Sequence, residues 1–433
     1  MLDIIAVLIP AIFFIVIIIA TIIKKINKTL VSIIVGLITL IFVLFYYNFS
    51  FADVLLKLVG REDLGYIKIY MLIIGMNLIT SVLYESDVFQ FIALKTIKLT
   101  RGNRILMFIL FGVLTVFVSS FISNLLTIFV IAPITILLTG ILKTDAEPYL
   151  VLEVILLNVG ALITLTSSNL NILVCSLFDI NFTEFFIYFA PLGFLLFGVT
   201  MVSAYFLMRK QLKMPDNTQI QYLKNFDDWS IVKDKSLFYR ALIIFIITMV
   251  FIVLFSEFLG LVAILSGFLM IVFVVKDKEE GIKKINLNTI IYFAGIFITL
   301  EALKLSGLFD IVGNVLGSVL PLNPFLIALV ILWVTGSLSS MVANIPLALA
   351  FSPIVENLLP FIGDAYTPLL VTALICGSNL GDNLFPAGDV AIQLDIVEQQ
   401  GGRRITIKTF FKIGFILAIL QLIITSFYLY FLV

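Results

Sequence analysis

The chain has 433 residues, 62% of them hydrophobic and only 12% charged, and its formal net charge is zero. A water-soluble protein is excluded, because a soluble domain could not bury so much apolar surface, and the balanced charge gives no reason to expect a nucleic-acid partner. The sequence contains no His, so it lacks the most frequent zinc ligand and the usual proton acceptor near neutral pH. We therefore expect no metal site and no cofactor apart from a transported or coupling Na⁺ or H⁺.

Apolar runs long enough to cross a bilayer, which takes about 20 residues, follow one another from the N-terminus onward. The first run, 1–23, has no basic region before it, which predicts a retained helix rather than a cleaved signal peptide. Further spanning helices are predicted at 29–48, 65–84, 147–177, 183–208, 238–256, 259–275, 288–304, 366–396 and 409–433. The chain is thus predicted to be an all-α integral membrane protein with about ten transmembrane helices in a lipid bilayer.

Two other apolar stretches, 104–142 and 325–360, are too long for one span and carry polar residues at their centres. The central residues are Ser119, Ser120, Ser123 and Asn124 in the first stretch, and Ser337, Ser339, Ser340 and Asn344 in the second. Each stretch is predicted to be a re-entrant hairpin, two helices joined by a turn that enter and leave the membrane on one side. A turn at membrane depth can satisfy its backbone only around a cavity, so both hairpin tips are candidates for a binding site.

The two hairpins belong to an internal repeat. Ser119–Asn124 aligns with Ser339–Asn344, and Pro133 and Pro353 follow at the same distance, each before an Ile. We predict a first transmembrane repeat at 1–208, with its interrupted helix at 147–177, and a second repeat at 238–433, with its interrupted helix at 366–396. Residues 209–237 are predicted to be a cytoplasmic linker.

Basic residues predict the orientation of the repeats, because cytoplasmic loops carry an excess of Lys and Arg. With both termini outside, only Lys57, Arg61, Lys68 and Lys304 lie on the outer side. The first hairpin then opens to the cytoplasm and the second to the exterior, which predicts inverted repeats in a multi-pass protein of the plasma membrane.

The interrupted helices carry Gly, Pro and polar residues in mid-span, from Asn158 to Asn171 and from Gly377 to Asp389. Such residues break a helix in lipid and expose N–H groups that favour anions and carbonyl oxygens that can hold a cation. At the serines of the tips, helix-to-helix packing is the alternative interpretation. The candidate ligands of the transported ion are Ser123, Asn124, Thr164, Ser168, Asn171, Asn344, Asn379 and Asn383.

Asp382 and Asp389 lie within a predicted span, where a carboxylate is costly and indicates function. Burial favours the protonated form, so such a residue could exchange a proton for a cation. Asp389 is expected to be the main coupling carboxylate, and Glu301, near a helix end, is a third candidate. An aqueous vestibule around the two aspartates is the alternative. Glu85 and Asp87 precede basic residues, so an interfacial ion pair and a functional role are both open for them. Glu153, Asp179 and Glu257 are expected at the membrane interface.

Several motifs are similar to those of one transporter group. Ser123-Asn124-Leu125 resembles a Ser-Asn-Thr hairpin tip, and Ala343-Asn344-Ile345-Pro346 resembles the tip Asp-Asn-Val-Pro without its Asp. The segment from Gly160 to Asn171 resembles the signature Gly-Gly-x-x-Thr-x-Ile-Gly-Asp-Pro-Pro-Asn without its prolines, and Arg101–Arg104 also matches. Over about Gly65–Val433 the chain resembles the ion transporter superfamily, which includes arsenite permeases, P-protein permeases, sodium/proton antiporters of the NhaD type, citrate–metal carriers and divalent anion/sodium symporters.

The resemblance implies that the hairpin tips and interrupted helices enclose a small transported ion. It is compatible with a homodimer, and an arsenite-permease-like carrier could also use a soluble ATPase subunit. A secondary active transporter is the leading hypothesis, for an inorganic ion such as arsenite or sodium or for a small organic anion, coupled to protons or sodium by alternating access. A sodium-coupled di- or tricarboxylate carrier is the alternative.

Other classes of protein are less well supported by the sequence. An ion channel would need a filter repeat or a long polar pore helix, neither of which is present. An enzyme is not expected, because there is no nucleophile–base pair or metal motif and therefore no candidate catalytic residue. A primary pump is excluded by the lack of a P-loop.

Overall fold

The computed structural model describes residues 4–23, 26–48, 50, 65–100, 103–213, 227–319, 323–386, 388–402 and 405–433. These residues contain helices and no strand, and nine of their helices are long and apolar enough to cross a bilayer. The prediction of an all-α, multi-pass membrane protein is therefore confirmed.

The first half of the chain contains α1 (Ile4–Ile22), α2 (Lys28–Tyr46), α4 (Gly65–Glu85), α5 (Val88–Lys98), α6 (Arg104–Ser119), α7 (Asn124–Ile141), α8 (Glu147–Gly160), the 3-10 turn η1 (Leu165–Ser167), α9 (Asn169–Leu177) and α10 (Phe182–Met208). The second half contains η2 (Asp228–Ile231), α12 (Lys235–Leu254), η3 (Ser256–Phe258), α13 (Leu259–Phe273), α14 (Lys278–Ile282), α15 (Leu287–Leu305), α16 (Leu308–Val319), α17 (Pro324–Ser339), α18 (Asn344–Ile362), η4 (Asp364–Tyr366), α19 (Thr367–Gly381), η5 (Asp382–Leu384), α20 (Gly388–Gln399) and α21 (Ile407–Tyr430).

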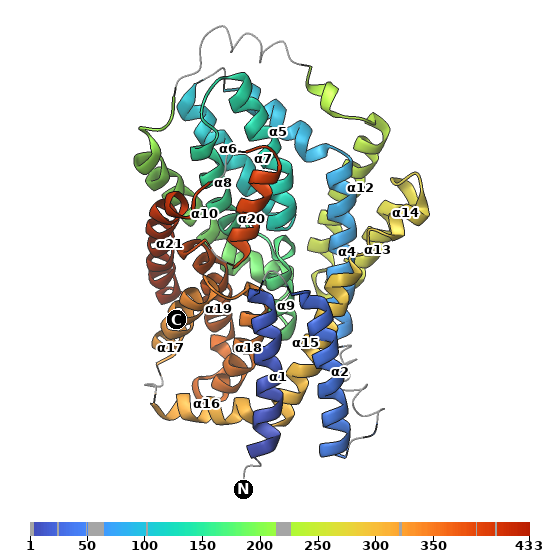
Figure 1. The fold of residues 1–433 in the computed structure, drawn as a ribbon, viewed down its shortest axis with the longest axis vertical. Coiled ribbons are helices and arrows are strands. Elements are labelled where there is room, and N and C mark those ends of the chain that lie inside the picture. Colours follow the sequence, from blue (N-terminus) through green and yellow to red (C-terminus); the bar gives the residue numbers. More distant parts are fainter. Residues whose placement is uncertain are drawn as a thin grey trace.

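The order of elements from α4 to α10 recurs from α15 to α21. The matched helices α6 and α17 each follow an Asn cap, Asn103 and Asn323, whose side-chain oxygen accepts two N–H groups of the first turn. In Figure 1 the α6–α7 pair lies in the upper half of the view and the α17–α18 pair in the lower half, with α9 at mid-height. The polar turns of both pairs thus interrupt otherwise apolar stretches.

Besides the five-residue α14 and the 3-10 turns, the helices α5 and α16 were not predicted. α5 has 11 residues and α16 has 12, too few to cross a bilayer, so a search for long apolar runs does not detect them. Each follows a long helix and precedes a hairpin, and α16 lies across the lower end of the molecule in Figure 1. Residues 214–226 of the predicted linker lie outside the described residues, as do Arg101 and Gly102 of the Arg101–Arg104 motif and the outer residues Lys57 and Arg61.

Helices of the two halves pack against each other: α2 packs against α15, and α4 packs against α13. A Cβ atom at Gly36 would lie 2.7 Å from the Cα of Gly295, so the α2–α15 crossing requires glycine. The Ser32 hydroxyl donates to the Tyr292 carbonyl at 2.7 Å across the same contact. This close crossing brings the beginnings of α2 and α15 together near the middle of the molecule (Figure 1).

Candidate functional site

A cavity of about 380 Å³, here called the central cavity, lies between the two halves. Both hairpin tips and both interrupted helices contribute to it. Its lining consists of Lys28, Thr29, Ser123, Asn124, Leu125, Ser168, Asn169, Leu170, Asn286, Asn288, Thr289, Tyr292, Phe293, Asn344, Ile345, Asn379, Asp389 and Gln393. Six residues that the sequence analysis singled out, Ser123, Asn124, Ser168, Asn344, Asn379 and Asp389, therefore share one cavity.

Helix beginnings dominate this lining. The first turns of α2, α7, α9, α15, α18 and α20 all contribute residues to it. The N-cap residues, Ser123 before α7 and Ala343 before α18, form no side-chain capping bond. The first N–H groups at both tips therefore remain available to a ligand. Because each helix beginning carries roughly half a positive charge, the cavity favours an anion.

The tip of the first hairpin is tied to the second half by a series of amide hydrogen bonds. Asn124 Nδ2 donates to Asn158 Oδ1 at 2.7 Å, and Asn158 Nδ2 donates to Asn383 Oδ1 at 3.1 Å. Asn383 Nδ2 then donates to the Ile155 carbonyl at 3.2 Å. Asn158 and Asn383 are fully buried, so they position Asn124 from behind the cavity wall.

The tip of the second hairpin is held differently. Asn344 Nδ2 donates to Asp382 Oδ2 at 3.0 Å, while Asn344 Oδ1 accepts the Ser339 hydroxyl at 2.7 Å. Asp382 has no exposed surface, and its Oδ1 has no hydrogen-bond partner within the described residues. Asp382 thus lies behind the tip and reaches the cavity only through Asn344.

The remaining predicted ligands stabilise the interruptions. Thr164 Oγ1 donates to the Ser120 carbonyl, and Asn171 Nδ2 donates to the Ala161 carbonyl at 2.6 Å. Asn379 Nδ2 donates to Asn171 Oδ1 at 3.2 Å, which links the two interrupted helices. Thr164 and Asn171 are buried and absent from the cavity lining, so they hold the helix ends that line it.

Charged residues in the central cavity are of both signs. Lys28, at the first position of α2, extends its ammonium group to 5.4 Å from the centre of the Tyr292 ring. Asp389, in the first turn of α20, lines the same cavity and is half-buried. The one anionic and one cationic side chain offset each other, so the helix beginnings leave a net positive field.

The cavity also contains acceptors without a partner. Asn124 Oδ1 and Gln393 Oε1 are buried and have no hydrogen-bond partner in the part of the chain that the structure describes. Such oxygens can accept a hydroxyl hydrogen or contact a cation. A ligand that carries carboxylates and a hydroxyl group would therefore match both kinds of group in the lining.

Two acidic residues lie elsewhere than expected. Glu301 accepts the Tyr66 hydroxyl at 2.5 Å where α4 meets α15, and it does not line the central cavity. The prediction that Glu153 lies at the membrane interface is wrong, because this residue of α8 is fully buried against α7. Glu85 does form an ion pair, with Lys284.

Sequence reasoning missed Lys28, Asn158 and Gln393. Asn27 and Asn286 are the signals that were available, because each is a helix cap a few residues before an apolar run and so marks the beginning of α2 or α15. Asn158 lies at the start of the predicted interruption, and its partners come from distant segments.

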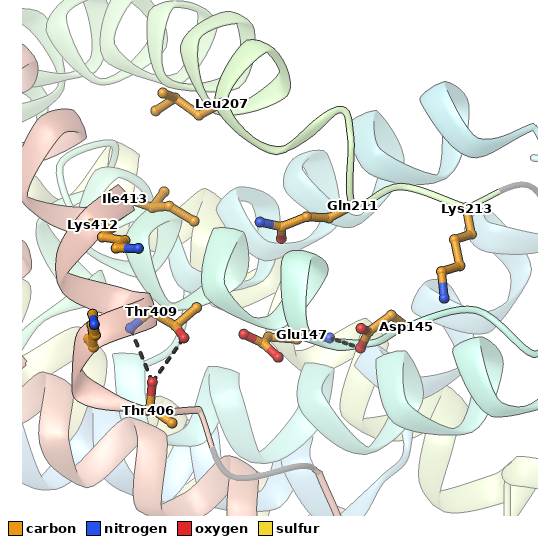
Figure 2. A pocket seen from close by; sticks show the side chains of 10 residues that line it. Asp145, Glu147, Leu207, Gln211, Lys213, Thr406, Thr409, Lys412 and Ile413 are labelled. Atoms are coloured by element: carbon orange, nitrogen blue, oxygen red, sulfur yellow. Dashed lines mark hydrogen bonds between the residues drawn. The ribbon is translucent and has the colours of Figure 1, made fainter.

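A second cavity of about 650 Å³, here called the surface cavity, lies between the beginning of α8, the end of α10 and the beginning of α21. Figure 2 shows Glu147 of α8 with Lys412 of α21 on one side and Lys213 on the other. No predicted ligand lines it, and its charged side chains are not held by buried partners, so the central cavity is the better binding site.

Comparisons with known proteins agree with a transporter. Residues 14–377 match the model of a family described as citrate transporter, CitMHS. A 46 kDa membrane protein of Mycobacterium leprae is 24% identical over 392 residues, 87% of this chain and 90% of the relative. An uncharacterized transporter of Mycobacterium tuberculosis is 23% identical over 391 residues, 86% of this chain and 90% of the relative.

Two further proteins extend the comparison. The human P protein is 25% identical over 427 residues, 79% of this chain and 51% of that protein. The solved structure of Neisseria gonorrhoeae MtrF is described as one of a class of antimetabolite efflux pumps. The alignment covers 90% of this chain and 83% of the MtrF chain, with a TM-score of 0.59 and 12% sequence identity, which shows a shared fold. The relatives agree that this chain is a membrane transporter. The family model matches most of this chain, so the chain belongs to the citrate transporter family.

Proposed function

We propose that this protein is a secondary active carrier for a small organic anion of the di- or tricarboxylate class. A proton or sodium gradient drives the transport, and the two halves alternate access to the central cavity. The observation that supports this most directly is the convergence of six helix beginnings and Lys28 on one cavity. A carboxylate at a helix beginning gains on the order of 0.3–1 kcal/mol per favourable contact, and several such contacts add up.

An inorganic cation as the main substrate has less support. Asp389 is the only carboxylate in the described cavity lining, and Lys28 lies in the same lining. A cation would therefore meet little net negative charge together with several N–H donors. The unpartnered oxygens of Asn124 and Gln393 suit a hydroxyl group on the anion or an accompanying cation.

The site residues have distinct proposed roles. Ser123, Asn124, Ser168, Asn344 and Asn379 contact the anion, whereas Thr164, Asn171 and Asn383 hold the helix ends in place. Asp389 neutralises Lys28 when no substrate is bound, so that the empty carrier changes orientation without a bare charge, which is costly in a dry gate.

The arrangement in the cell is part of the same proposal. The repeats are inverted in the plasma membrane with both termini outside, and the linker lies in the cytoplasm. A homodimer is the proposed assembly, and gradient coupling makes a soluble ATPase subunit unnecessary.

Transport by the purified protein in proteoliposomes tests this function. Labelled citrate, succinate, arsenite and sodium are offered under an imposed proton or sodium gradient, and collapse of each gradient by its ionophore identifies the coupling ion. We expect saturable accumulation of citrate or succinate that stops when one gradient is collapsed. Accumulation of arsenite or sodium without any organic anion would refute the proposal.

A further inference from the structure

Glu153 is a buried carboxyl group that the proposed transport function does not use. It lies on α8 with no exposed surface and does not line the central cavity. Its Oε1 accepts the Thr135 hydroxyl of α7 at 2.5 Å, while its Oε2 has no partner in the described part of the chain. Asp382 is the other acidic residue of the described chain without exposed surface.

An ionised carboxylate in such surroundings is strongly disfavoured, and a buried group of this kind is held in its neutral form. No cation forms an ion pair with Glu153 among the described residues. Several elements that pack against α8 carry charged or titratable side chains, whereas α7 has none. These side chains are Arg104 on α6; Glu184, Tyr188 and Tyr205 on α10; Cys376 on α19; Asp382 on η5; Asp389, Asp395 and Glu398 on α20; and Lys408, Lys412, Tyr428 and Tyr430 on α21. None of these side chains forms a hydrogen bond or ion pair with Glu153 in the described part of the chain, where the one hydrogen bond of Glu153 is to Thr135.

The partner of Glu153 suits both of its protonation states. A hydroxyl group can donate to a carboxylate and can also accept from a carboxylic acid. Asp382 differs, because the Asn344 amide nitrogen that it contacts can only donate. Of the two buried carboxyl groups, only Glu153 therefore has a described partner that can also accept a hydrogen bond from the protonated form.

Along α8, Glu153 lies close to the surface cavity. Tyr149, one turn earlier on the same face of α8, has a buried hydroxyl without a partner in the described residues. Glu147, at the beginning of α8, lines the surface cavity (Figure 2). The distance from Glu147 to Glu153 is about 9 Å along the helix axis.

Glu153 is also coupled to the central cavity through α7. Asn124 and Thr135 lie about three turns apart on one face of α7, and both bind α8, through Asn158 and Glu153. A movement of the α6–α7 hairpin that changes the cavity at Asn124 therefore also changes the surroundings of Glu153.

We propose that Glu153 carries the proton that couples transport to a proton gradient. One proton binds the carboxylate from one side of the membrane and leaves on the other side after the hairpin has moved, so Glu153 is unchanged after each cycle. This inference rests on the proposed anion transport and adds the residue that binds the coupling proton.

Replacement of Glu153 by Gln keeps the shape of the protonated form and removes the exchangeable proton. In proteoliposomes we expect E153Q to retain exchange of labelled for unlabelled citrate or succinate. Accumulation driven by a proton gradient is expected to be lost, and the pH dependence of uptake to become flat. E257Q, the same change at an exposed glutamate, is the control and is expected to behave as wild type. Normal proton-driven accumulation by E153Q, or loss of pH dependence in D382N alone, would overturn the inference.

Infrared spectroscopy tests the protonation of Glu153 without any substrate. We expect wild type to show the carbonyl stretch of a buried carboxylic acid, T135V to shift this band and E153Q to lack it. If E153Q does not fold, T135V still provides the test, because it keeps the carboxyl group and removes the one hydrogen bond that Glu153 forms within the described residues. A band that neither change affects overturns the inference. If wild type carries no organic anion, the proposed function fails, and the infrared result still decides the protonation of Glu153.

Discussion

Replacement of Lys28 by Met removes the positively charged side chain from the lining of the central cavity. The unbranched apolar stem over the Tyr292 ring is kept, so the packing at the beginning of α2 changes little. If the cavity binds an organic anion, the variant loses the one cationic side chain in the described lining. Weaker binding of polycarboxylates is the expected result.

The magnitude follows from the surroundings of Lys28. Two unit charges 4 Å apart attract by about 1 kcal/mol in water and about 4 kcal/mol at an effective dielectric constant of about 20. Lys28 is exposed in this structure, so the lower part of this range applies, about 1–2 kcal/mol. Because about 1.4 kcal/mol corresponds to tenfold in affinity, we expect the apparent KM to rise by about five- to thirtyfold.

Uptake kinetics and calorimetric binding to the purified protein measure this change. The effect is expected to be larger for citrate than for succinate and to shrink as salt is added, because charge is the cause. K210M, the same change at an exposed lysine beyond the end of α10, is the control. Unchanged citrate affinity in K28M, or an equal loss in K210M, would refute the assignment of an anion to this cavity.

Three further predictions concern the tips, the cavity aspartate and the orientation in the membrane. Asn124→Ala and Asn344→Ala are each expected to reduce uptake about fivefold or more, since each breaks a hydrogen bond of about 1 kcal/mol or more that positions a tip. Wild-type uptake by folded variants would return both residues to a packing role. Asp389→Asn removes the negative charge that is proposed to neutralise Lys28 in the empty carrier, so net uptake is expected to fall while exchange and its pH dependence persist. A flat pH profile would instead identify Asp389 as the proton carrier. A Cys at the exposed position Ser230 is expected to react with an impermeant thiol reagent only from the cytoplasm, and a Cys at the exposed position Ala365 only from outside. Reaction of both from one side would contradict inverted repeats.

Local features of the sequence were sufficient for the helices and their interruptions. Apolar length marks α4, α10, α15 and α21, because a chain in lipid must satisfy its backbone within each helix. The positions of the turns before Asn124 and Asn344 followed from polar residues within apolar stretches. The interruptions from Asn158 to Asn171 and from Gly377 to Asp389 were likewise readable, since Gly and Pro act through their own backbone conformations.

Only the tertiary structure decided which side chains meet. Lys28 looked like a cytoplasmic residue next to an apolar run, and the Gly36–Gly295 crossing of α2 with α15 brings it to the cavity instead. Glu153 looked interfacial by its distance from the beginning of α8, but packing of α7 over it excludes water. Glu301 looked able to reach the cavity and instead binds Tyr66. Burial of a polar side chain depends on neighbours that are distant in sequence, whereas the formation of a spanning helix depends on its own residues and the lipid around it.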